Sequence, residues 1–90
     1  MPPSRSRGAL NTAVARTLTQ AQQAAGLTQI QLAERSGIER VTMRRYLTGE
    51  RAIDMDRLDR LADALGLSPV EVMERAVALM NDDAEGRPGG

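Results

Sequence analysis

Apolar residues recur at intervals of three and four along most of this chain, the spacing that places side chains on one face of an α-helix. The clearest run passes from Leu10 through Val14 and Leu18 to Ala21 and Ala25. Glycine commonly follows the last residue of a helix, and glycines separate the periodic stretches at Gly26, Gly37, Gly49 and Gly66. The pattern therefore predicts helices over about 11–25, 29–36, 40–48, 55–65 and 69–80. Because no segment alternates like a strand, the predicted fold class is all-α.

The residues that precede three of these segments are typical helix N-caps. Thr28 is followed three residues later by Gln31, and Ser68 by Glu71. Both pairs have the spacing of a capping box, in which two side chains satisfy free backbone amides reciprocally. Asp54, before the fourth segment, is a favoured N-cap by itself. These signals strengthen the predicted starts of the second, fourth and fifth helices.

Ninety residues are enough for one domain with a single modest core. Residues 1–9 contain Pro, Ser, Arg and Gly, and we expect them to form a flexible basic arm. The predicted domain occupies residues 10–80. Residues 81–90 are acidic and glycine-rich, and we expect them to be a disordered tail.

The second and third predicted helices are separated by only three residues, Gly37 to Glu39. Such a short turn sets two helices at a steep angle, as in a helix-turn-helix. In the third helix, Met43, Tyr46 and Leu47 have the spacing of a core face. The remaining positions form a basic, hydroxyl-bearing face, suited to hydrogen bonds with guanine and methyl contact with thymine in the major groove. They are Arg40, Val41, Thr42, Arg44, Arg45 and Thr48.

The formal net charge is zero, but the charge is unevenly distributed. Residues 1–51 hold eight arginines and three acidic residues, a balance of +5, whereas residues 52–90 hold four arginines and nine acidic residues, a balance of −5. Such asymmetry indicates a polyanionic partner for the first half. Arg51, just beyond the third helix, is placed to reach phosphate.

The chain has no cysteine and no histidine, which removes the thiolate nucleophile, the usual general base and the commonest metal ligands. We therefore expect no enzymatic activity, no metal and no cofactor. The apolar runs are too short to span a membrane, and the first eight residues lack the apolar stretch of a signal peptide. The expected location is the cytoplasm.

Two stretches, LTQIQLAERSGIERVTMRRYLTGER (Leu27–Arg51) and RLDRLADALGLSPVEV (Arg57–Val72), resemble the helix-turn-helix of the XRE family of phage Cro and repressor proteins. The resemblance implies a five-helix, lambda-repressor-like domain that binds double-stranded DNA. By position, it implies that Arg40, Val41, Thr42 and Arg45 contact bases. It further implies backbone contacts by four residues, Gln29, Arg44, Thr48 and Arg51.

The sequence departs from the family pattern at four positions. Glu39 stands where Ser or Thr usually caps the third helix. Gln22 and Leu47 replace an arginine and glutamate that are often paired, so both charges are absent together. Ile30 occupies a position that is often polar, either as an exposed apolar side chain or as a contact for something else.

Helix 69–80 has two apolar stripes, more than a small monomer needs. One consists of Val70, Met73, Val77 and Met80, and we expect it to form a homodimer surface. The whole pattern then predicts a repressor, of phage or mobile-element type, that binds a near-palindromic operator as a dimer. The alternative is an antitoxin or protein-interaction module that binds a partner protein through this helix. Arg5 and Arg7 are candidates for minor-groove contacts from the arm.

Overall fold

The computed structural model describes residues 8–85 of the chain. They form five α-helices: α1 (Ala9–Ala24), α2 (Gln29–Ser36), α3 (Arg40–Leu47), α4 (Met55–Ala64) and α5 (Pro69–Glu85). No strand occurs within residues 8–85. The predicted all-α fold with five helices is confirmed.

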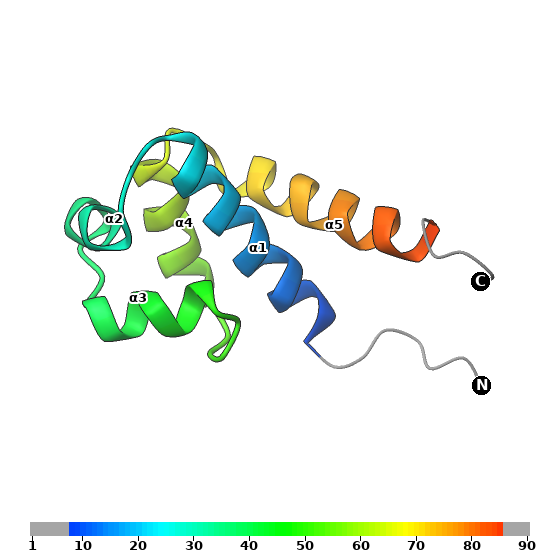
Figure 1. Cartoon of the computed structure of the whole chain (residues 1–90), viewed down its shortest axis with the longest axis horizontal. Helices are drawn as coiled ribbons and strands as arrows, with labels where there is room; N and C mark the ends of the chain where they lie inside the picture. Colours follow the sequence, from blue (N-terminus) through cyan, green and yellow to red (C-terminus); the bar gives the residue numbers. More distant parts are fainter. Residues whose placement is uncertain (1–7, 86–90) are drawn as a thin grey trace.

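The long helices α1 and α5 pack against each other in antiparallel directions, and the three short helices gather at one end of this pair (Figure 1). α2 packs on α4 and on α3, while α1 also contacts α3. The C-terminal half of α5 extends away from the short helices (Figure 1). This arrangement leaves α3 at the edge of the molecule, with one side against the core.

Every helix supplies a large, fully buried side chain to one core: Leu18, Leu32, Met43, Leu61 and Val72. Burying an aliphatic or methionine side chain of this size stabilises a fold by about 1.5–3 kcal/mol. Because the five come from five different helices, the same core fixes the position of α3 and of the four helices around it.

The predicted N-caps are present. The Thr28 hydroxyl accepts from the amide of Gln31 at 3.0 Å, and the Gln31 side chain accepts from the amide of Thr28 at 2.9 Å. Ser68 and Glu71 form the same reciprocal pair at 3.1 Å in both directions. Asp54 accepts from the amide of Arg57 at 2.8 Å. These bonds define the starts of α2, α5 and α4.

The predicted apolar stripe of the first helix is partly wrong. Val14 and Leu18 are buried, but Leu10 is 39% exposed, and Ala13 and Thr17 belong to the buried face. The buried face is wider than the stripe because α1 packs against both α5 and α3. Thr17 is tolerated there because its hydroxyl donates to the carbonyl oxygen of Ala13 at 2.8 Å.

The last helix is longer than the sequence pattern indicates. α5 continues to Glu85, five residues into the segment predicted to be a disordered tail. The sequence contains no glycine or proline between Pro69 and Gly86, so no residue in that interval breaks the helix. Residues 86–90 and the greater part of the predicted basic arm, residues 1–7, lie outside the described residues.

None of the helices within residues 8–85 is long and apolar enough to cross a lipid bilayer.

Candidate nucleic-acid interface

The turn between α2 and α3 depends on the backbone of Gly37. Its φ of +72° is in the left-handed region, where glycine has no steric penalty. The amides of Gly37 and Ile38 both donate to the carbonyl oxygen of Ala33, at 2.9 and 3.2 Å. These bonds end α2, and the buried Ile38 side chain fixes the turn to the core. α3 then crosses α2 steeply: in Figure 1, α2 is seen nearly end-on and α3 lies across the view.

The inward face of α3 is the one predicted. Met43, Tyr46 and Leu47 are 1%, 2% and 7% exposed. The hydroxyl of Thr19 in α1 also donates to the carbonyl oxygen of Leu47 at 3.5 Å. Tyr46 is therefore a core anchor, and α3 is held from one side along its length.

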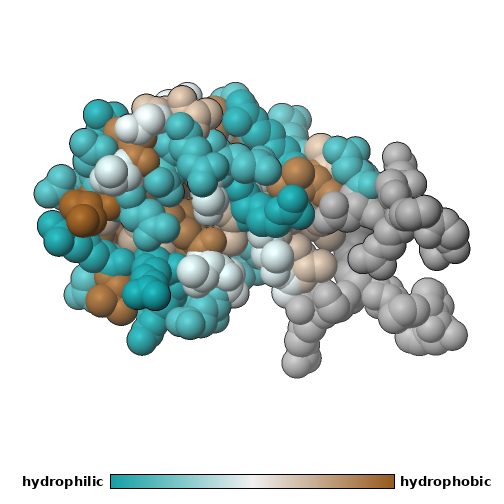
Figure 2. Space-filling view, viewed as in Figure 1, coloured by the Kyte–Doolittle hydropathy of each residue, from teal (hydrophilic) through white to brown (hydrophobic). Residues whose placement is uncertain are grey.

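The opposite face of α3 is open to solvent. Arg40, Arg44, Arg45 and Thr48 are exposed, Val41 is 57% exposed, and Thr42 is half-buried. The helix contains three arginines and no acidic residue. Its visible surface in Figure 2 is mainly hydrophilic. A rigid, positively charged helical face with one exposed branched aliphatic side chain has the size and chemistry to enter a DNA major groove.

The other two predicted backbone-contacting residues are also exposed. Gln29 is the first residue of α2. Arg51 lies in the loop after α3, where its amide donates to the carbonyl oxygen of Arg45 at 3.1 Å. Arg51 is thus held beside the α3 face. Arg5 and Arg7, the predicted minor-groove residues, lie outside the described residues.

One charged residue at this face was not predicted from the sequence. A carboxylate oxygen of Glu50 lies 3.5 Å from Nε of Arg45, and the two side chains are 67% and 52% exposed. The residues are five apart, and the turn at Gly49 brings them together. The sequence signal for this ion pair is an acidic residue directly after the glycine that follows α3, only five residues from the proposed base-reading arginine.

The four departures from the family pattern have different structural outcomes. Glu39 precedes α3 without making a side-chain cap hydrogen bond. Leu47 is in the core, and Gln22 donates from Nε2 to the carbonyl oxygen of Leu27 at 2.8 Å while its Oε1 is buried without a partner. Ile30 is 48% exposed. The Gln22 bond ties the end of α1 to the residue before the α2 cap.

The structure separates the two apolar stripes of α5. Val72 and Ala76 are fully buried and form the core stripe. In the stripe predicted to dimerise, Val70 and Val77 are 65% and 43% exposed, while Met73 and Met80 are partly buried against the core.

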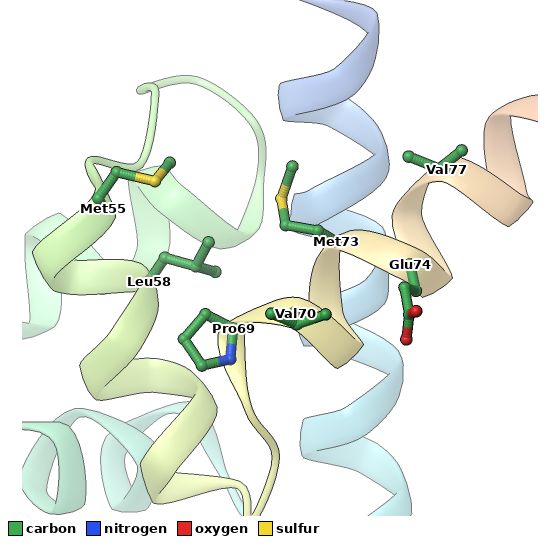
Figure 3. A pocket seen from close by; sticks show the side chains of 7 residues that line it. All are labelled: Met55, Leu58, Pro69, Val70, Met73, Glu74 and Val77. Carbon is green, nitrogen blue, oxygen red and sulfur yellow. The ribbon is translucent and has the colours of Figure 1, made fainter.

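This second stripe borders an apolar groove between α4 and α5, with a volume of about 550 Å³ (Figure 3). Met55 and Leu58 of α4 line its other side, and Met55 is 70% exposed. Met73 and Val77 line the groove from α5, and Glu74 is the one charged residue among those that line it. The apolar surface is therefore broader than α5 alone.

The chain is similar to known proteins in both sequence and fold. The sequence matches the family described as "Helix-turn-helix domain" over residues 13–74. Among curated proteins, no significant match is found.

Two solved regulators share the fold. The clp gene regulator ClgR from Corynebacterium glutamicum is 25% identical, with a TM-score of 0.81 over 86% of this chain and 82% of that chain. The restriction-modification controller protein C.AhdI from Aeromonas hydrophila is 29% identical, with a TM-score of 0.66 over 69% of this chain and 94% of that chain. These matches and the fold confirm the helix-turn-helix resemblance stated from the sequence.

Proposed function

We propose that this chain, which belongs to the helix-turn-helix domain family, is a sequence-specific DNA-binding regulator of transcription. The observation that carries the proposal is the α3 face, where three exposed arginines stand on a helix whose other side is anchored in the core. From here on, α3 is called the recognition helix. Both solved relatives are regulators, one a gene regulator and the other a controller protein, and this supports a regulatory role.

The proposed contacts divide into two classes. Arg40, Val41, Thr42 and Arg45 read base edges in the major groove. Gln29, Arg44, Thr48 and Arg51 contact the sugar-phosphate backbone and set the register of the recognition helix on the duplex. The exposure of Arg40 and Val41 in the first turn of the helix supports the first class. The half-buried Thr42 has less surface to offer than its neighbours.

A homodimer would place two recognition helices about 34 Å apart, in successive major grooves of a near-palindromic operator. The surface that supports this part of the proposal is the exposed stripe of α5, in which Val70 and Val77 project away from the core. Occupancy of such an operator blocks RNA polymerase, so the proposed activity is repression, of the phage or mobile-element type. The protein then acts in the cytoplasm, where it meets the DNA.

Selection of binding sites from a random duplex pool tests the proposal, followed by mobility-shift titration of the selected site across a salt series. We expect a near-palindromic consensus, binding that survives random competitor DNA, and affinity that falls steeply with salt because arginines displace counterions from phosphate. Recovery of no consensus, with equal affinity for all duplexes, would rule out sequence-specific regulation.

The second candidate is a protein-interaction function, such as that of an antitoxin. It is favoured by one observation, the apolar groove whose rim residue Met55 is 70% exposed. The measurement is co-expression with the product of the adjacent gene. A stable complex that Met55→Glu disrupts, while operator binding by the free protein is retained, would assign the groove to that partner. Such a partner would leave the recognition helix free but would compete with the proposed homodimer, because Val70 and Val77 also line the groove.

A further inference from the structure

Three residues of the turn after the recognition helix contact Arg45. The carbonyl oxygen of Arg45 accepts from the Thr48 hydroxyl at 3.2 Å and from the Arg51 amide at 3.1 Å. The carboxylate of Glu50, between these two residues, reaches the Arg45 side chain and lies 3.5 Å from its Nε. Backbone and side chain of Arg45 are therefore both held by residues 48–51.

The turn is itself fixed to α1, so the position of Glu50 does not depend on its own ion pair. Gly49 has a φ of +78° and lies against Thr12 and Ala15 of α1. Its carbonyl oxygen accepts from Nδ2 of Asn11 at 3.4 Å, and Oδ1 of Asn11 accepts from the amide of Ile53 at 3.3 Å. Asn11 therefore holds the residues on both sides of Glu50.

The Glu50 carboxylate lies at Nε of Arg45 and not at the two terminal nitrogens of the guanidinium. A guanidinium has five N–H donors in a planar fork, and guanine O6 and N7 accept a bidentate pair from it. A carboxylate at Nε lies beside the part of the guanidinium that is nearest the Arg45 backbone. The outer edge, formed by the two Nη groups, stays available for a base.

The charge of Glu50 acts in the same direction. A carboxylate beside the recognition helix is repelled by phosphate, so it weakens contacts that any DNA sequence offers. It also neutralises part of the charge that would draw Arg45 to the backbone. A base contact through both Nη groups tolerates the carboxylate, whereas a purely electrostatic contact is weakened by it.

We propose that Glu50 is a specificity-determining residue, which positions Arg45 through Nε for bidentate recognition of a guanine and lowers binding to other DNA. This inference rests on the proposed function, because it assigns a role only within DNA recognition. Exposed ion pairs contribute little to folding stability. The effect of Glu50 is therefore expected in discrimination between sequences and not in the stability of the fold.

The test uses the full chain and the operator selected with the wild-type protein. Mobility-shift titrations with Arg45→Ala first identify the base pair whose replacement no longer matters when Arg45 is absent. Glu50→Ala and Glu50→Gln are then titrated on the operator, on that single-base variant and on random duplex. Glu34→Gln on α2 is the matched control for removing an exposed negative charge elsewhere.

Glu50→Ala is expected to reduce discrimination at the base pair assigned to Arg45 about fivefold or more, the lower range for one bidentate contact. It is also expected to raise affinity for random duplex. Glu50→Gln keeps a polar oxygen beside Nε but loses the charge, so it should retain more discrimination while raising random binding to the same extent. In the Arg45→Ala background, Glu50→Ala should leave base discrimination unchanged.

Three outcomes would overturn the inference. Glu50→Ala could raise affinity for operator and random duplex by the same factor, which would make Glu50 only a repulsive charge. The titrations with Arg45→Ala could show no base pair at which the sequence preference is lost. Glu50→Ala could alter base discrimination in the Arg45→Ala background as much as it does in the wild-type background. If the wild-type chain selects no consensus, the proposed function fails as well, whereas a wild-type consensus with unaltered discrimination in Glu50→Ala refutes the role of Glu50 alone.

Discussion

The side chain of Asn11 in α1 donates to the carbonyl oxygen of Gly49 at 3.4 Å, across 38 residues of chain. The same side chain accepts from the amide of Ile53 at 3.3 Å. One amide near the start of the domain thus holds the loop that leaves the recognition helix.

Replacing this amide removes both contacts. We expect Asn11→Ala to lower the free energy of unfolding by about 1–2 kcal/mol, because two partly buried backbone groups lose a partner. Urea denaturation followed by circular dichroism measures the change. Gln20→Ala, an exposed position of the same helix, is the control, and equal destabilisation by the two variants would contradict a bridging role for Asn11.

Gly37 allows a test of the turn without a change in packing. A Cβ added at this position meets nothing within 4 Å, but the φ of +72° is unfavourable for side chains. We expect Gly37→Ala to destabilise the domain by about 1 kcal/mol, the usual cost of a left-handed backbone. Gly37→Asn should cost less, since asparagine tolerates this region. Thermal unfolding that ranks Ala above Asn in stability would be inconsistent with a left-handed turn here.

The start of the recognition helix can be improved. Glu39 has the extended backbone of an N-cap but makes no side-chain cap bond. Aspartate is a favoured cap and keeps the negative charge that suits a helix N-terminus. We expect Glu39→Asp to stabilise the domain by about 0.5–1 kcal/mol, measured by denaturant unfolding. Glu39→Gln, which loses the charge without gaining a cap, should not stabilise, and a gain of the same size in both would show that capping is not the cause.

The two classes of proposed DNA contact predict different mutant behaviour. Arg45→Ala should cost about 1–3 kcal/mol on the operator and relax preference at one base pair. Arg44→Ala and Arg51→Ala should weaken binding to all sequences and reduce the salt slope by about one. Arg75→Ala, on exposed α5 surface, is the control. Uniform loss across sequences for Arg45→Ala would assign Arg45 to phosphate instead.

The proposed dimer can be tested at exposed positions that do not support the core. Val70 and Val77 are 65% and 43% exposed, so Val70→Glu and Val77→Glu should fold normally. We expect both to shift a dimer to monomer in sedimentation experiments, because charges replace apolar surface, and to weaken operator binding. Ala78→Glu, exposed on a different side of α5, should change neither. A wild-type monomer that still protects two half-sites on DNA would assign dimerisation to the DNA-bound state.

Local signals were sufficient for most of the secondary structure. The capping residues Thr28, Asp54 and Ser68 predicted three helix starts because their chemistry acts within one turn. The spacing of Met43, Tyr46 and Leu47 predicted them as the anchor of the recognition helix, since it places all three on one face of a helix. For α1, the spacing predicted the buried face only in part, because contact with two other helices buries Thr17, while Leu10 is exposed.

By itself, then, the sequence determined the five helices, the short turn at Gly37 and the basic outward face of α3, because capping, glycine geometry and helical periodicity are local properties. Tertiary structure decided which apolar stripe of α5 enters the core, with Val72 and Ala76 inside and Val70 outside. It also decided that Glu50 meets Arg45 and that Asn11 holds their turn. These relationships depend on how distant helices pack, and a one-dimensional pattern does not contain that information.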